Sequence, residues 1–222
     1  MASKGWAGPL PAVKSKVDLV YDNVRAAIAE GDLEPGERIN MDELARALGV
    51  SKIPIREAIK RLESEGLVVS RAHAGVVVAP IDRTEMRGVF LAREAIEGLV
   101  GRLAAERVTD AVLEDLERIQ QEMRAELDRG AVDRLPELNS GFHRRLAEAS
   151  GYRILGELTE QLLFTIRRYR LTLPAGEQNW HSVADEHDTI IQALRRKDAD
   201  AVAVAARAHI ISQAGQEVAE RP

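Results

Sequence analysis

The chain of 222 residues contains no cysteine, which excludes disulfide bonds and any thiolate metal or catalytic site. No apolar run approaches the length of a membrane span, and the N-terminus lacks the apolar core of a secretory signal peptide. Internal repeats and low-complexity tracts are also missing. With 45% hydrophobic and 30% charged residues, the composition is that of a globular protein, which we expect to be cytoplasmic.

The net charge of −5 is distributed unevenly along the chain. Residues 1–80 contain 11 basic and 11 acidic side chains, so the whole acidic excess lies in residues 81–222. A local basic patch can bind nucleic acid despite an acidic total, and such binding depends strongly on salt. Residues 46–61 form a patch of this kind, with Glu57 as the acidic member and five basic ones: Arg46, Lys52, Arg56, Lys60 and Arg61.

Residues 49–66 have the pattern of a tight turn followed by a helix. The Ser51 hydroxyl is suited to cap that helix, Pro54 is tolerated in its first turn, and Gly66 suits a left-handed stop. We therefore expect a helix over about 52–65. Apolar side chains recur on one face of this helix, namely Ile55, Ala58, Ile59 and Leu62. Basic side chains recur on another face, namely Lys52, Arg56 and Lys60.

The flanking segments complete a winged helix-turn-helix. An apolar stripe predicts a helix over 17–30, and a shorter helix over 41–48 ends at a glycine that permits the turn. Two helices joined in this way fit the major groove of DNA. Two β-type runs, 67–71 and 76–79, predict a hairpin wing. In the turn of this hairpin, His73 could touch the minor groove of DNA. Gly75 could do the same, but a turn of this composition needs a glycine for its backbone conformation in any case.

The rest of the chain predicts an all-α antiparallel helical bundle, so the fold class is mainly α. We predict an N-terminal arm over 1–13, a winged helix-turn-helix over 14–80, a linker over 81–83 and a helical domain over 84–217. The expected helices of that domain lie near 83–106, 109–129, 132–149, 152–172, 179–197 and 199–217.

Three of the five histidines lie at inward positions on three different predicted helices: His143, His187 and His209. Asn139 precedes His143 by four residues, so both side chains can point into the bundle. Imidazole is the commonest neutral ligand of a divalent metal. The alternative is that each histidine is a core residue with its own hydrogen bond, and the pattern alone leaves both interpretations open.

Arg93 lies on the inward face of the helix near 83–106, where a guanidinium needs a partner. One candidate is Glu97, four residues on along the same helix. The other is a carboxylate ligand from outside the chain, which a guanidinium can bind with two parallel hydrogen bonds.

Residues 14–80 resemble the DNA-binding domain of the GntR family of bacterial regulators. The motifs that carry the resemblance are 31–38, 43–45, 50–59, 62–63 and 66–67. It implies that Ser51, Lys52, Ile53 and Arg56 contact DNA, with Lys60 as a helper. Lys52 stands where the family often has arginine, and Asp42 lies where some members place a DNA-contacting arginine.

Residues 83–215 resemble the FadR C-terminal (FCD) type of effector domain, through motifs at 93–97, 142–143, 147–151, 186–187 and 207–209. The resemblance implies a divalent metal ion, zinc first and nickel or manganese as alternatives, held by an aspartate and three histidines. His143, His187 and His209 match, whereas Asn139 occupies the aspartate position. A neutral amide is a weaker ligand, so the metal could differ or be absent. Arg93 would clamp a small organic or sugar acid effector.

These features predict a ligand-responsive transcription regulator, a repressor by the commoner family behaviour, that binds an inverted-repeat operator as a homodimer. One alternative is a metal-dependent enzyme that uses the histidine cluster. No nearby carboxylate has a spacing that assigns it as a general base, so we do not expect an enzyme. Another alternative is a regulator that binds an acyl ligand without metal.

Overall fold

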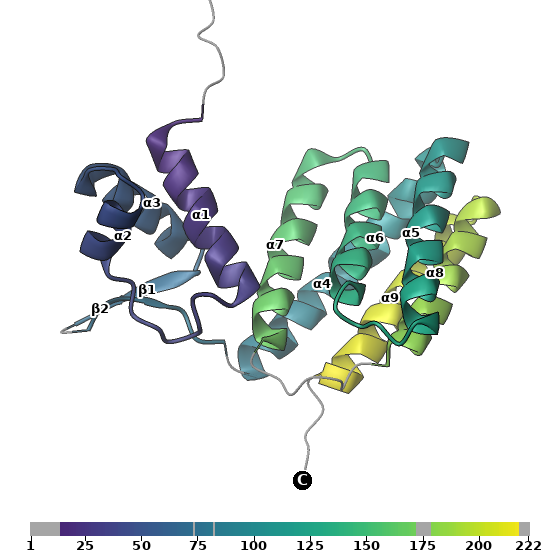
Figure 1. Ribbon diagram of the computed structural model, residues 1–222. Helices are drawn as coiled ribbons and strands as arrows, with labels where there is room; N and C mark the ends of the chain where they lie inside the picture. The colour runs from purple at the N-terminus through teal and green to yellow at the C-terminus, as the bar shows by residue number, and fades with distance from the viewer. Residues whose placement is uncertain (1–13, 73, 82, 172–178, 218–222) are drawn as a thin grey trace, which may run out of the picture. The chain divides into compact units, whose positions relative to one another are not determined.

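The computed structural model describes residues 14–72, 74–81, 83–171 and 179–217, so the predicted arm over 1–13 and His73 lie outside the described residues (Figure 1). The chain divides into two compact units between Pro80 and Ile81. The first contains α1 (Lys16–Glu30), α2 (Met41–Ala47), α3 (Lys52–Ser64), β1 (Val68–Arg71) and β2 (Gly75–Val78).

The first unit has the winged helix-turn-helix architecture that the sequence predicts. Its core is formed where α1 packs on α3, through fully buried aliphatic side chains such as Val24, Ile28, Ile55 and Leu62. Asn40 caps α2 by accepting hydrogen bonds from two backbone N–H groups of its first turn. The turn into α3 passes through Gly49 with a φ of 63°, a left-handed conformation that favours glycine.

The wing is a two-stranded antiparallel sheet in which Val68 pairs with Val78 and Arg71 with Gly75. Arg38 forms an additional bridge to Val77, so the segment before α2 extends the sheet at one edge. The inner side chains of the wing are buried, and they close the small core over the end of α3.

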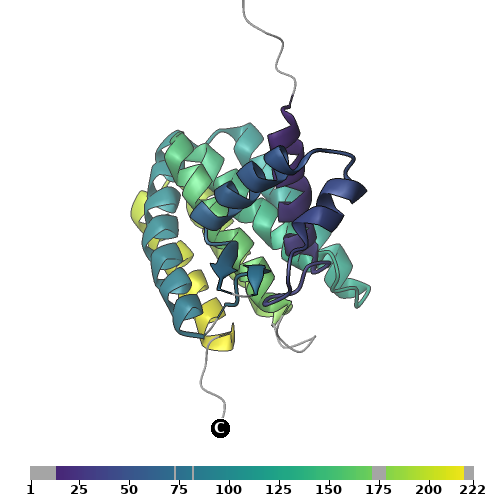
Figure 2. The same ribbon diagram turned by 90° about the vertical axis from the view of Figure 1, so that its left-hand side faces the viewer.

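The second unit is a helical bundle (Figure 1). In it α6 packs between α5 and α7, and α4 runs along α9, as Figure 2 also shows. Its main core contains Phe142, Leu146, Ile190 and Leu194. The helices described are α4 (Arg83–Arg107), α5 (Asp110–Asp128), α6 (Leu135–Ala149), α7 (Arg153–Arg170), α8 (Trp180–Arg195) and α9 (Ala199–Glu217).

Two local expectations need correction. Ser51 stands at the N-cap of α3, but its side chain makes no capping hydrogen bond there. The sixth helix begins at Leu135 rather than 132, with Pro136 in its first turn, where the missing backbone N–H of proline costs little. None of the described helices is both long enough and apolar enough to cross a membrane.

Candidate functional site

Three buried histidines from three helices meet in the second unit. His143 lies on α6, His187 on α8 and His209 on α9, and their side chains are 1%, 0% and 1% exposed. One ring nitrogen from each lies within 4.8 Å of the others. The Nε2 atoms of His143 and His209 are 3.2 Å apart. The structure therefore brings together the three histidines that the sequence places at inward positions.

Two of these rings are oriented by carboxylates through their Nδ1 atoms. His143 contacts Glu97 of α4, and His209 Nδ1 lies 2.6 Å from Glu186 Oε2 of α8. If each Nδ1–H donates to its carboxylate, each Nε2 carries a lone pair, and these lone pairs face each other. A cation between them would relieve that repulsion, and a carboxylate behind each imidazole is the usual outer partner of a metal-bound histidine.

His187 lacks any such partner. Among the residues that the structure describes, neither of its buried ring nitrogens has a hydrogen-bond partner. Its ring stacks on Phe142, with 3.8 Å between ring centroids and 7° between the planes. An unpaired buried polar group costs about 1–3 kcal/mol, so His187 fits the role of a metal ligand better than that of a satisfied core residue.

Burial also favours the neutral form of the His187 and His143 imidazoles. It lowers the pKa of His187 well below the ordinary value of 6.5. For His143, burial outweighs the attraction of Glu97 and lowers the pKa to about 4. Metal ions bind the neutral form of imidazole, so both rings are ready to act as ligands at neutral pH.

Arg93 is 1% exposed and forms the internal ion pair that its spacing allows, with its Nε 2.7 Å from Glu97 Oε1. Burial opposes ionisation of Glu97, but Arg93 and His143 outweigh it and hold the pKa of that carboxyl at about 2. Glu97 therefore links the arginine to a candidate ligand. Contact between Arg93 and an effector stays a prediction.

Two buried amides complete the site. Asn139 Oδ1, the atom in the place of the family's aspartate, lies 3.4 Å from Gln213 Nε2 of α9. Gln213 Nε2 is also 3.0 Å from His209 Nε2, and Gln213 Oε1 accepts a hydrogen bond of 3.1 Å from Arg93 Nη1. Gln213 is not among the residues predicted for this site, although it follows His209 by four residues on the same helix.

The predicted DNA-binding side chains of α3 all lie on its exposed surface: Ser51, Lys52, Ile53, Arg56 and Lys60. Ile53 is 67% exposed, so its side chain is free to contact a ligand of this face. Lys52 Nζ lies 2.7 Å from Asp42 Oδ1 of α2, and this contact holds the pKa of the Asp42 carboxyl below its ordinary value. Lys52 is therefore paired with an acidic side chain on the surface that is predicted to contact DNA.

Gly75 begins β2 with a φ of 79°, which explains the glycine by its backbone. The guanidinium of Arg38 lies close by, 3.6 Å from where a Cβ at position 75 would be. Arg38 and Arg71 are exposed basic side chains of the wing that the sequence analysis did not single out.

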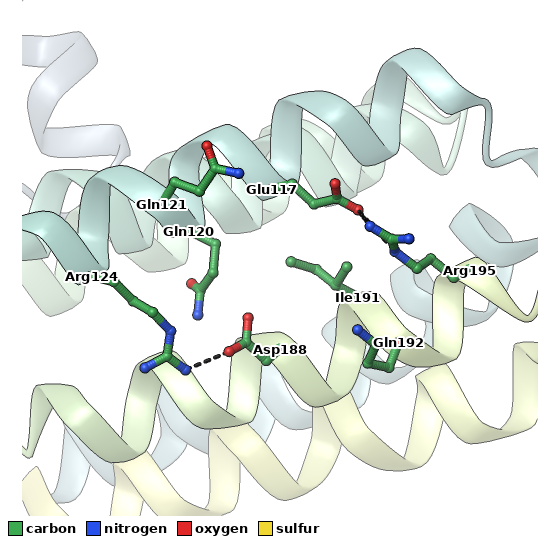
Figure 3. A pocket seen from close by; sticks show the side chains of 8 residues that line it. All are labelled: Glu117, Gln120, Gln121, Arg124, Asp188, Ile191, Gln192 and Arg195. Atoms are coloured by element: carbon green, nitrogen blue, oxygen red, sulfur yellow. Dashed lines mark hydrogen bonds and ion pairs between the residues drawn. The ribbon is translucent and has the colours of Figure 1, made fainter.

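A surface pocket of about 250 Å³ lies between α5 and α8, and its lining includes Asp188, the residue that follows His187 (Figure 3). Arg124 pairs there with Asp188, and Arg195 with Glu117. Its charged side chains therefore neutralise one another in pairs, and the pocket presents no concentrated charge to a ligand.

Comparison with protein families matches both units. The model described as "Bacterial regulatory proteins, gntR family" matches residues 16–78, and the model of the FCD domain matches residues 88–212. The chain belongs to the GntR family. It is a DNA-binding transcription regulator with an FCD effector domain, as the sequence predicts.

Relatives of this GntR regulator have the same class of function. It is 33% identical over 183 residues to the Nta operon transcriptional regulator of Aminobacter aminovorans, covering 79% of this chain and 82% of that one. It is 28% identical over 201 residues to the transcriptional repressor RspR of Escherichia coli K12, covering 90% and 86%. These relatives confirm that the GntR regulator is not an enzyme.

The fold of this GntR regulator also agrees with solved structures. Escherichia coli McbR/YncC superposes with a TM-score of 0.77 at 21% identity, covering 90% of this chain and 96% of that chain. The mainly α fold with an N-terminal winged helix-turn-helix is thereby confirmed.

Proposed function

We propose that this GntR regulator is a repressor that binds an inverted-repeat operator as a homodimer and responds to a small organic or sugar acid at a metal site. The observation that carries the proposal is the buried cluster of His143, His187 and His209 in the domain of an FCD regulator. The relative named as a repressor supports the direction of control. Operator DNA lies in the cytoplasm, which is the location that we propose.

The exposed side chains of α3 support DNA reading by this helix. The apolar side chains of its inner face, such as Ile55 and Leu62, are fully buried, so the opposite face is left for DNA. Arg56 is proposed to pair with a base or phosphate, because it lies in the N-terminal half of α3, the part of such a helix that reaches the major groove. Gly75 and His73 are proposed as wing contacts with the minor groove or backbone.

A second copy of the chain is the partner that we propose for the outer face of α4 and α9. Four large aliphatic side chains are exposed there: Leu91 61%, Leu99 44%, Val204 65% and Ile211 55%. The two helices run along each other (Figure 2), and we propose that these side chains together form one apolar strip. A symmetric dimer buries such a strip against its own copy, and a palindromic operator matches that symmetry.

The variant Val204→Glu tests this dimer, because it places a charge at the most exposed of the four side chains. Sedimentation should show a monomer, whereas Ile154→Glu, which changes an aliphatic residue of α7 that is 56% exposed, should leave a dimer. A dimer that survives Val204→Glu would place the interface elsewhere.

The metal that we propose is divalent, zinc first and nickel or manganese as alternatives. His143, His187 and His209 would hold it, with the Asn139 carbonyl oxygen as a fourth, neutral ligand. Such an ion supplies a Lewis-acidic anchor for a carboxylate oxygen. Arg93 is proposed to bind the same carboxylate through its guanidinium, which the ion pair with Glu97 holds in place.

Metal analysis of the purified protein tests the site directly. We expect one ion per chain, lost in His187→Ala and retained in His181→Ala, which changes an exposed histidine of the same helix. A chain that binds no metal and is instead stabilised by acyl ligands would favour the metal-free alternative. Selection of bound sequences from random duplex DNA tests the operator, and an enriched inverted repeat is the expected result.

A further inference from the structure

Gln213 blocks the ligand atoms of the histidine cluster. Its amide is 0% exposed, and its Nε2 lies 3.0 Å from His209 Nε2 and 3.4 Å from Asn139 Oδ1. His209 Nδ1 faces the Glu186 carboxylate, so Nε2 is the nitrogen left to act as an acceptor or a ligand. A metal at the cluster would therefore need the two atoms toward which Gln213 Nε2 points.

The other end of the same amide engages Arg93. Gln213 Oε1 accepts a hydrogen bond of 3.1 Å from Arg93 Nη1, while Arg93 Nε donates to Glu97 at 2.7 Å. All of these side chains are at most 2% exposed, so no bulk water is available to replace a lost partner. A rotation of Gln213 away from His209 would thus leave Arg93 Nη1 without its acceptor.

We propose that Gln213 couples metal binding at the histidines to carboxylate binding at Arg93. Gln213 must leave His209 Nε2 before that atom can bind a metal, and the same movement frees Arg93 Nη1 for an incoming carboxylate. A carboxylate that replaces Gln213 as the acceptor for Arg93 likewise favours metal binding at the histidines, because Gln213 then no longer contacts His209 Nε2. The two ligands then raise each other's affinity by the same factor.

This inference rests on the metal and acid sites proposed above, and it assigns their coupling to one side chain. Gln213→Met is the decisive variant, because methionine has a similar length and volume but neither the amide donor nor its acceptor. Gln216→Met is the matched control, since it changes the same residue type three positions on in α9, outside the cluster. Thermal unfolding establishes that both variants are folded. If Gln213→Met does not fold, Gln213→Ala replaces it as the test variant.

The experiment is a titration with Zn²⁺ by calorimetry, in acetate or in sodium chloride of equal ionic strength. In the unmodified protein, acetate should raise the affinity for Zn²⁺ on the order of tenfold, within the usual range of coupling between sites. Gln213→Met should bind Zn²⁺ more tightly than the unmodified protein in chloride, and acetate should add roughly twofold or less. Gln216→Met should behave as the unmodified protein does.

Equal enhancement by acetate in Gln213→Met and in the unmodified protein would overturn the inference while leaving the metal site in place. So would a Gln213→Met variant that binds Zn²⁺ no more tightly in chloride. If the unmodified protein binds no Zn²⁺ in either buffer, the proposed metal site fails as well, so the two failures are distinguishable.

Discussion

Replacement of His187 by leucine should have opposite effects on stability with and without metal. The His187 ring is 0% exposed, and both of its nitrogens lack hydrogen-bond partners among the described residues. In chelator, the variant removes a buried polar group that costs about 1–3 kcal/mol when unpaired. It also loses the stacking on Phe142, which is worth about 0.5–1.5 kcal/mol.

The balance of these two terms favours the variant. The metal-free His187→Leu protein should be more stable than the unmodified protein by about 1 kcal/mol, which raises Tm by roughly 2–4 °C for a chain of this size. With Zn²⁺ at about 100 times its Kd, the unmodified protein should gain about 2.7 kcal/mol from binding. The variant should gain little, so the order of stability reverses.

Thermal unfolding in EDTA and in Zn²⁺ measures both effects, with His181→Leu as the control at an exposed position of α8. A His187→Leu variant that is less stable than the unmodified protein in EDTA would refute the reasoning, because His187 would then contribute favourably to the metal-free core. Equal Zn²⁺ stabilisation of both proteins would remove His187 from the ligand set.

Three further predictions concern pH and DNA. Without metal, the free energy of unfolding from urea titrations should fall by about 3 kcal/mol as pH drops from 6.5 to 4. His143 takes up a proton over this range in the unfolded chain, whereas its pKa of about 4 keeps it neutral in the folded chain. A constant free energy of unfolding would refute this. Arg56→Ala should weaken operator binding by about 1–3 kcal/mol in gel-shift assays and relax specificity, and undiminished specific binding would contradict its role. Asp42→Asn should free Lys52 for phosphate and steepen the salt dependence of binding to non-specific DNA by about one counterion, whereas an unchanged slope would show that the ion pair persists on DNA.

Local periodicity predicts most of this fold because each helix carries a continuous apolar stripe. The helix boundaries agree within a few residues, and the exceptions have local causes. Ser51 has the backbone position of a cap without the hydrogen bond, and α6 begins at Leu135, later than the predicted start at 132, with Pro136 in its first turn. A capping hydrogen bond depends on the side-chain rotamer, which sequence spacing does not determine.

The candidate site is only partly predictable for a different reason. Inward stripes bring His143, His187 and His209 to the core, but the carboxylates behind two of them come from other helices. Glu97 is foreseeable as the i+4 partner of Arg93, yet its contact with His143 depends on how α4 packs on α6. Such contacts between helices have no signature in one sequence.

The most direct test of a metal-assisted acid sensor is thermal unfolding of the purified protein with a panel of small carboxylic and sugar acids, with and without chelator. The account predicts that one acid raises Tm and that the rise disappears when chelator removes the metal. The same acid should also release the protein from its operator. Stabilisation that persists in chelator, or no stabilisation by any acid in either condition, would contradict the account.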